Sequence, residues 1–488
     1  MFKILAEEYV NVFTALNLFN FITFRTGAAK ATYKAAKKDT VFTFESNLTY
    51  KDTVIGGASA KDSLTASVSG LTATSGVLNI SDIEKISITT GGNNIIDGSK
   101  ITGSSVNIAV TDYKQTFTNF DLAQTITIGI GADVGNTSSE IDVTPADATG
   151  AADTLNVNIQ NGAATTTIID APSSIETLNI QEQVAANAVT IDMSTFEGAN
   201  IILGTKTGVT RTAKTDFGAL HKNARTLTST SADKVDADFS ASTAAVTISG
   251  LGTDIQDYDG GTKGDTFTIG KTVAIKHLVD GNGGTDTTNI TVGALFADPS
   301  GIDTENINIT VEAGTDQTTS SAFGAGVDNI TLTGGNSLST FTAGVLNDAL
   351  KTFDASSFLG NIIVDVETDD MDSTQVITAG SLATDEIEYQ TIIGGTDYLY
   401  STGVEILDLD IDQTGTLDLS NATGVKTVDV DVSANDTFTI DKLAGTETIV
   451  LTAAGSAGII EAKLADDEGS ADSLSFKIGA GTINAAGG

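Results

Sequence analysis

The chain has 488 residues, with 63 acidic and 25 basic side chains, two histidines and no cysteine, and its formal net charge is −38. The absence of cysteine excludes disulfides, thiolate zinc sites, iron–sulfur clusters and cysteine nucleophiles. Two histidines make a metal site built from several histidines nearly impossible. The acidic balance argues against a nucleic-acid partner, because neutralising phosphates requires many lysines and arginines. It favours the binding of cations.

The charge is uneven along the chain. Residues 1–61 carry eight basic and five acidic side chains, whereas the other 427 residues carry 17 and 58. A basic end on an acidic body predicts two surfaces with different partners, and the alternative is a helical end that carries lysines by chance. The candidate anchor residues of the basic end are Lys30, Lys34, Lys37 and Lys38.

The first 40 residues predict a short helical N-terminal segment. Apolar side chains recur near helical spacing from Leu5 to Phe24, and residues 28–36 are rich in alanine and lysine, which have high helix propensity. Glu7 and Glu8 stand where a secretory signal would carry positive charge. The interrupted apolar run also falls short of the roughly 18 residues that span a membrane. We therefore expect neither a cleaved signal peptide nor an integral membrane protein.

From Asp39 onward the pattern changes to strict alternation, rich in threonine, valine and isoleucine, as in Leu155–Ile159 and Leu407–Ile411. Such alternation predicts strands with one buried face, and clusters of glycine, asparagine and aspartate between them predict turns. The expected fold is mainly β, with parallel β-solenoid-like and β-sandwich-like domains. We expect β-rich domains over residues 41–250, a glycine-turn segment over 251–300 and a solenoid-like assembly domain over 301–488.

A loose repeat supports the solenoid. An acid or lysine is followed by one residue and then by two apolar residues separated by a polar one. The pattern starts at Glu84, Glu176, Glu197, Glu305, Asp328, Glu405, Lys426 and Glu447, and Lys351 continues the spacing. Steps of 21–23 residues equal one turn of a parallel solenoid, in which stacked rungs share one core. The alternative is accidental recurrence in a threonine- and valine-rich chain.

Residues 257–291 hold the best candidate for a metal site. Two segments 21 residues apart fit, imperfectly, a glycine-rich nonapeptide that binds calcium between stacked turns. In such turns glycines permit the tight bend, and a carboxylate from each turn completes an oxygen cage. The candidate residues are Asp259, Gly260, Gly261, Gly264, Asp265, Asp280, Gly281, Gly284 and Asp286, with Asp397 as a weaker echo. The alternative is a pair of glycine–aspartate turns without metal.

Acidic residues also alternate along predicted strands, as at Asp408, Asp410 and Asp429, Asp431. Alternation places these carboxylates on one face, where they repel each other unless a cation lies between them. The alternatives are solvated acids that protect strand edges and the catalytic carboxylates of a glycosidase. The chain has no tryptophan and 6% aromatic residues, which is a poor supply for a sugar-binding cleft. We therefore do not expect an enzyme.

The phrases Asp153–Val157, Ser174–Ile180 and Gly403–Leu409, together with the glycine-rich turns, resemble the RTX-type surface-layer proteins of Gram-negative bacteria. The resemblance covers about residues 40–488. It implies an extracellular, self-assembling array that needs calcium, an N-terminal part that contacts lipopolysaccharide, and type I secretion without an N-terminal signal. The expected function is therefore that of a structural surface-layer protein. The alternative is an RTX-like extracellular adhesin or filament subunit.

Overall fold

The structure is a computed structural model. It describes residues 12–14, 21–24, 32–35, 39–44, 48–58, 61–68, 70–72, 74–90, 93–102, 105–110, 114–122, 125–128, 139–146, 153–159, 166–182, 189–205, 214–230, 235–250, 256–272, 278–293, 298–319, 322–344, 346, 349–367, 375–390, 395–411, 414–432, 437–452, 459–466 and 473–478. The chain divides into two compact units. Unit 1 comprises Met1–Gly252 and Tyr258–Thr262, and unit 2 comprises Thr253–Asp257 and Lys263–Gly488.

Unit 1 is a stack of parallel strands in three sheets, with one 3-10 helix, η1 (Gly98–Lys100). Its long sheet contains β2 (Phe21–Phe24), β4 (Val41–Phe44), β6 (Ser63–Val68), β8 (Lys85–Thr90), β10 (Ser105–Val110), β12 (Thr125–Ile128), β14 (Thr154–Ile159), β16 (Thr177–Glu182), β18 (Asn200–Thr205), β20 (Thr226–Ser229) and β22 (Thr247–Gly250). The first side sheet contains β1 (Val12–Thr14), β3 (Thr32–Lys34), β5 (Thr53–Ile55) and β7 (Asn79–Ser81). The second side sheet contains β9 (Asn94–Asp97), β11 (Lys114–Phe120), β13 (Ser139–Pro145), β15 (Thr166–Asp170), β17 (Val189–Asp192), β19 (Thr215–Ala219) and β21 (Val235–Asp238). β23 (Gln256–Asp259) lies where the chain divides between the units.

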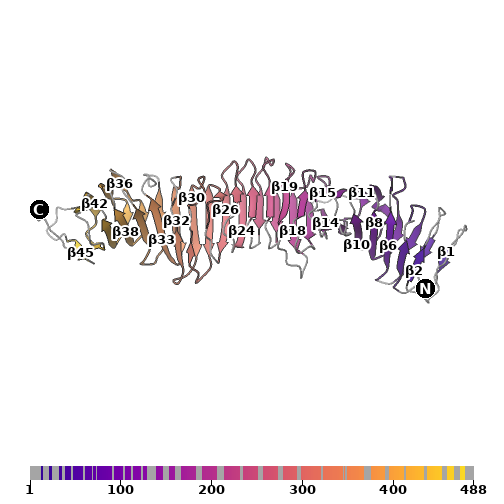
Figure 1. Cartoon of the computed structure of the whole chain (residues 1–488), viewed down its shortest axis with the longest axis horizontal. Coiled ribbons are helices and arrows are strands. Elements are labelled where there is room, and N and C mark those ends of the chain that lie inside the picture. The colour runs from indigo at the N-terminus through magenta and orange to yellow at the C-terminus, as the bar shows by residue number, and fades with distance from the viewer. Residues whose placement is uncertain are drawn as a thin grey trace. The chain divides into compact units, whose positions relative to one another are not determined.

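Unit 2 repeats this construction, and its strands follow one another in chain order (Figure 1). Its long sheet contains β24 (Thr266–Thr272), β26 (Thr287–Val292), β28 (Asn306–Val311), β30 (Asn329–Gly334), β32 (Thr352–Phe358), β34 (Val376–Thr378), β37 (Ser401–Thr402) and β40 (Ala422–Thr423). The strands β25 (Leu278–Asp280) and β27 (Ile302–Asp303) pair beside it. The opposite sheet contains β29 (Gln317–Thr318), β31 (Thr340–Ala343), β33 (Asn361–Glu367), β35 (Glu386–Gln390), β38 (Ile406–Ile411), β41 (Thr427–Val432), β43 (Thr448–Leu451) and β45 (Ser475–Ile478). A short sheet contains β36 (Thr396–Tyr398), β39 (Gly415–Asp418), β42 (Thr437–Leu443) and β44 (Ile459–Leu464).

The alternation of the sequence produces this fold directly. In β14, Leu155, Val157 and Ile159 are buried, and the polar residues between them are not. Strands pair with the corresponding strand of the next rung, meaning the next turn of the solenoid, and the register of β14 and β16 places Leu155 against Leu178. Stacking like on like places apolar side chains in one continuous core.

The polar face of the strands is also stacked. The Asn179 amide donates a hydrogen bond to the Asn156 side chain over 2.9 Å, and the Asn308 amide donates to Asn289 over the same distance. These asparagine ladders satisfy the hydrogen-bonding groups of the side chains between rungs, and they favour one register on the outer face as well. A one-residue slip would break both the ladder and the core, so the two faces fix the same register.

The prediction of a parallel β-solenoid is confirmed. Every strand pairing that we find in the described part of the chain is parallel, so the β-sandwich-like component is not found there. The short helical segment predicted over residues 1–40 is not found either, because its described residues form β1, β2 and β3. Helix propensity is a weak preference, and the short runs Val12–Thr14 and Phe21–Phe24 gain partners by pairing with β3 and β4. Among the described residues, no helix is long and apolar enough to cross a membrane.

Candidate functional site: carboxylates stacked between rungs

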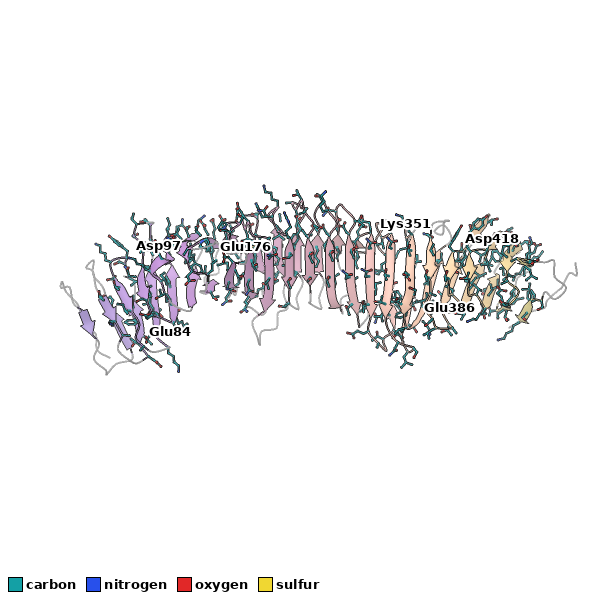
Figure 2. All side chains as sticks on the ribbon, turned by 180° about the vertical axis from the view of Figure 1, so that it is seen from behind. Glu84, Asp97, Glu176, Lys351, Glu386 and Asp418 are labelled. Carbon is teal, nitrogen blue, oxygen red and sulfur yellow. The ribbon has the colours of Figure 1, made fainter. Side chains whose placement is uncertain are left out.

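The loose repeat of the sequence marks one position in each rung, the residue immediately before a strand. We call this the corner position. In unit 1 it is held by Asp62, Glu84, Asp153 and Glu176. In unit 2 it is held before strands of the long sheet by Asp265, Asp286, Glu305, Asp328 and Lys351, and before strands of the opposite sheet by Asp385, Glu405, Lys426 and Glu447. Because paired strands lie in register, corner residues that precede neighbouring strands of one sheet lie one above another. Figure 2 labels Glu84, Glu176 and Lys351 among them.

In unit 1 the corner carboxylates join one rung to the next. The Thr40 N–H donates to Asp62 Oδ1 over 2.7 Å, and the Asp62 N–H donates to Glu84 Oε2 over 2.8 Å. The Asp153 N–H donates to Glu176 Oε2 over 2.8 Å in the same way. A carboxylate acceptor makes these hydrogen bonds stronger than neutral ones. The acids of the repeat therefore have a structural role at the corners.

In the glycine-rich segment predicted to bind calcium, corner carboxylates also accept backbone N–H groups of the preceding rung. The Asp265 N–H donates to Asp286 Oδ1 over 2.7 Å, and the Asp286 N–H donates to Glu305 Oε2 over 2.6 Å. Asp265 and Asp286 are 1% and 2% exposed. Burial, chiefly, and the neighbouring carboxylates raise the pKa of Asp286 to about 6, although the Asp265 N–H lowers it.

The glycines of this segment allow the rungs to approach. A Cβ at Gly281 would lie 2.1 Å from Asp286 Oδ2, and one at Gly264 would lie 2.8 Å from the Thr285 carbonyl oxygen. Gly284 adopts a φ of +131°, and its Cβ would meet the backbone of Lys263 at 2.4 Å. Gly260 and Gly261 are buried. The glycine pattern is thus explained by rung packing, whether or not an ion is present.

Of the other candidate ligands, Asp280 lies close enough to this corner for its charge to raise the pKa of Asp286. Asp259 and Asp280 are exposed, and Asp280 Oδ1 accepts a hydrogen bond from the Asn282 N–H. Asp397 lies in β36 of the short sheet, and burial raises its pKa. Within the described residues, no group of three or more acidic or histidine side chains is arranged to hold a metal ion.

Of the predicted anchor lysines, Lys34 is described and is exposed at the end of β3. Lys30, Lys37 and Lys38 lie outside the described residues. The prediction that they bind an anionic surface stays a prediction.

The outward face of β35, β38 and β41 carries stacked acids. We call the acid face the six residues Glu386, Glu388, Asp408, Asp410, Asp429 and Asp431. Register places Glu388 against Asp408 and Asp408 against Asp429, with Asp410 against Asp431 alongside. Figure 2 labels Glu386 on this face. Burial, followed by the neighbouring carboxylates, raises the pKa of Glu386, Glu388 and Asp408.

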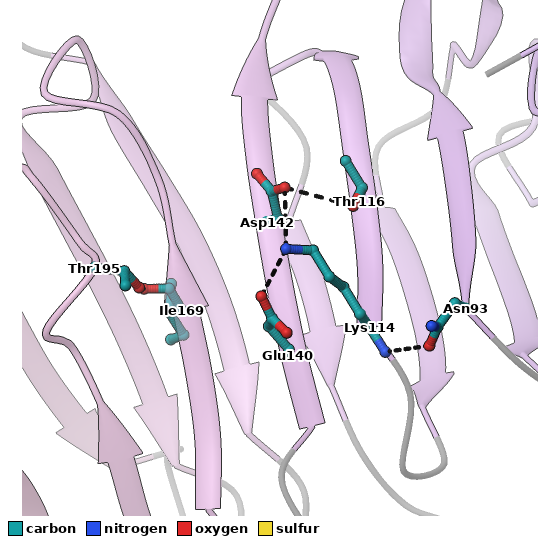
Figure 3. Close-up of polar contacts among 7 residues, drawn as sticks. All are labelled: Asn93, Lys114, Thr116, Glu140, Asp142, Ile169 and Thr195. Atoms are coloured by element: carbon teal, nitrogen blue, oxygen red, sulfur yellow. Dashed lines mark hydrogen bonds and ion pairs between the residues drawn. The ribbon is translucent and has the colours of Figure 1, made fainter. Parts of the chain in front are cut away.

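Unit 1 shows how the chain itself neutralises stacked acids. Lys114 Nζ lies 2.6 Å from Glu140 Oε1 and 3.5 Å from Asp142 Oδ2, two acids of β13 on the neighbouring rung (Figure 3). Lys214 pairs in the same way with Asp216 and Asp236, which lie in register. On the acid face, by contrast, no ion pair joins any of the six carboxylates to a lysine or arginine of the described residues. The acid face therefore carries charge that the described part of the chain leaves uncompensated.

Two features were missed by the sequence analysis. The lysine bridges gave no signal, because Lys114 and Glu140 are 26 residues apart. Asp385 was missed although it stands one residue before β35 and one rung before Glu405. Its segment Asp385–Tyr389 fits the repeat pattern, but it stands 20 residues before Glu405, one residue short of the 21–23-residue step.

Comparison of this chain with protein-family models, with curated proteins and with solved structures gave no match.

Proposed function

We propose that this protein is a structural subunit of an extracellular surface array, in which copies of the solenoid associate side by side and calcium lies between their acidic surfaces. The observation that carries the proposal is the acid face, where stacked carboxylates have no basic partner among the described residues. A flat, regular face with uncompensated charge favours association through a shared counter-ion, since like charges on two copies repel without one.

Two facing copies would supply more carboxylate ligands to a calcium ion than one copy does. Calcium takes six to eight oxygen ligands, whereas the described residues offer no group of three acidic side chains arranged around one point. Two faces brought together would double the number of carboxylates around each ion. In this proposal the basic N-terminal residues, including the exposed Lys34, contact an anionic cell-surface glycolipid such as lipopolysaccharide.

The test is assembly of the purified full chain in calcium, in magnesium and in chelator, followed by sedimentation and electron microscopy. We expect ordered assemblies in calcium that chelator disperses. The variant Glu388→Gln/Asp408→Asn/Asp429→Asn should lose the calcium requirement or the assembly. The matched control Asp142→Asn/Asp236→Asn removes two carboxylates that Lys114 and Lys214 already neutralise, and it should assemble as the wild type does.

A chain that stays monomeric at about millimolar calcium, a level typical of extracellular sites, would overturn the proposal. Binding of a soluble partner by that monomer would instead favour an adhesin. The anchor is tested separately with vesicles that contain lipopolysaccharide. Retention that persists after Lys30, Lys34, Lys37 and Lys38 are replaced by glutamine would exclude these residues as the anchor.

A further inference from the structure

At the corner formed by Asp385 and Glu405, both residues have a buried carboxylate oxygen without a partner, whereas at the corner of Asp153 and Glu176 only Asp153 has one. Asp385 has no solvent exposure. Its Oδ1 accepts a hydrogen bond from the Ile362 N–H over 3.0 Å, whereas its Oδ2 is buried and has no hydrogen-bond partner. Glu405 occupies the next rung, since its N–H donates to the Asp385 carbonyl oxygen over 3.1 Å. Glu405 Oε2 is likewise buried without a partner.

The other corners show what is missing. Glu84, Glu176 and Glu305 each use Oε2 to accept the backbone N–H of the corner residue one rung before. Glu405 has the same position relative to Asp385, but its Oε2 accepts nothing. Two carboxylates on consecutive rungs therefore each present one buried oxygen without a hydrogen. Leaving such an acceptor unsatisfied is costly.

The ionised groups at this corner lack one positive charge. Lys426, on the following rung, places Nζ 3.3 Å from Glu405 Oε1. The next corner residue, Glu447, accepts N–H groups of Ala444 and Thr446 in its own turn. The acid-face residue Glu386 and Asp365 of β33 lie at strand positions other than the corner. Two carboxylates and one ammonium group carry a net charge of −1, which one proton neutralises.

We propose that Asp385 and Glu405 share one proton, held between Asp385 Oδ2 and Glu405 Oε2, and that this proton joins the rungs of β35 and β38. Protonation supplies the single hydrogen that the two unpartnered oxygens lack, so that one carboxyl donates and the other accepts. The step is a simple protonation, taken from water and returned to it. The corner is thus a pH-sensitive bond between rungs.

The environment of Asp385 agrees with a retained proton. Burial, chiefly, together with the Glu405 carboxylate, raises the pKa of Asp385 to about 6, against the lowering effect of the Ile362 and Gly380 N–H groups. The unfolded aspartate has a pKa of about 3.9. A group whose folded pKa is raised contributes stability that is present below the unfolded value and is lost as pH rises through the folded value. The bond should therefore be closed in mildly acidic solution and open above about pH 6.

The experiment is hydrogen exchange of the full chain in chelator, followed by mass spectrometry, at about pH 5 and pH 7.5, which bracket the folded pKa. Exchange is expressed as protection relative to the intrinsic rate at each pH. Peptides covering residues 361–411 should lose protection by about tenfold or more at the higher pH. A tenfold loss is the change in the opening equilibrium that a difference of about one pKa unit between folded and unfolded states produces. Asp385→Asn keeps the acceptor for Ile362 and adds an N–H toward Glu405. It should keep these peptides protected at both pH values.

The matched control is Asp328→Asn, since Asp328 holds a corner where Lys351 Nζ already lies 2.6 Å from the carboxylate. It should leave the pH response of residues 361–411 unchanged. If Asp385→Asn fails to fold, Glu405→Gln offers an N–H toward Asp385 from the other side. The proposal is overturned if the wild-type response persists in both variants. It is also overturned if calcium at about millimolar concentration restores wild-type protection at the higher pH, since the occupant would then be a metal ion.

Discussion

The sharpest consequence of the acid face is that removing one carboxylate from its centre should stabilise the protein. Asp408 lies in register between Glu388 and Asp429, so its two nearest neighbours are one rung away on either side. Rungs of a sheet are about 4.8 Å apart. Two like charges at this distance repel by about 0.9 kcal/mol at the dielectric constant of water.

Salt sets the size of the effect. At physiological ionic strength the screening length is about 8 Å, which reduces each repulsion to about half, so the two neighbours together cost about 1 kcal/mol. At 0.01 M salt, where that length is about 30 Å, the cost rises to about 1.5 kcal/mol, and at 1 M it falls below about 0.4 kcal/mol. Asp408→Asn should therefore slow local opening of β38 by about fivefold at physiological ionic strength, with more at low salt and little at high salt.

The assay is hydrogen exchange of the β38 amides in wild type and Asp408→Asn at these three salt concentrations, in chelator. Asp236→Asn is the control, because Asp236 also stacks against an aspartate but pairs with Lys214. Removing that partly exposed ion pair should change stability by about 0.5 kcal/mol or less, and in the destabilising direction. A gain for Asp408→Asn that does not depend on salt, or no gain at all, would refute the claim that this face is under electrostatic repulsion.

Three further outcomes follow from the corners. Glu305→Ala should lower the free energy of urea unfolding by about 1–3 kcal/mol, because the Asp286 N–H loses its acceptor. Glu305→Gln keeps an acceptor oxygen, so a loss of equal size in that variant would contradict this. Hydrogen-exchange protection of residues 266–292 should fall as pH rises from about 4 to about 6, because the raised pKa of Asp286 makes the folded chain hold a proton that the unfolded chain has released. Asp286→Asn should remove this dependence on pH. Gly424→Ala should destabilise unit 2 by at least about 1 kcal/mol in thermal unfolding, since φ is +101° and a Cβ would lie 3.1 Å from Gly403 Cα; an unchanged melting temperature would contradict it.

The sequence predicted the solenoid because two periods coincide in it. Alternation within a strand and recurrence every 21–23 residues are both consequences of stacking, and at Glu405, Lys426 and Glu447 the predicted step equals the observed register. The step from Glu176 to Glu197 was wrong, since Thr177 pairs with Asn200, 23 residues on, and Glu197 accepts the Ser173 N–H instead. Turn lengths vary freely at the surface, so spacing between acids alone could not distinguish a corner from the turn before it.

The candidate site was harder to predict than the fold. The spacing of 21 residues predicted that Asp265 and Asp286 would lie at one corner. It did not predict that the Asp286 carboxylate accepts a hydrogen bond from the Asp265 N–H. A carboxylate that binds calcium and one that accepts a backbone N–H require the same glycine-rich turn and the same position. What distinguishes them is the partner of each oxygen atom, which no spacing in the sequence encodes.

The corners and the acid face place one constraint on any function of this chain. A parallel stack in register puts each residue type against its own kind, which favours apolar side chains and asparagines but sets carboxylates against carboxylates. The chain resolves this in three ways: a backbone N–H at Asp286 and Glu305, a lysine at Asp216 and Asp236 and, in our proposal, a proton at Asp385. The acid face of β35, β38 and β41 uses none of these three among the described residues. Since that arrangement costs stability, the cation or partner that removes the cost is where a search for function should begin.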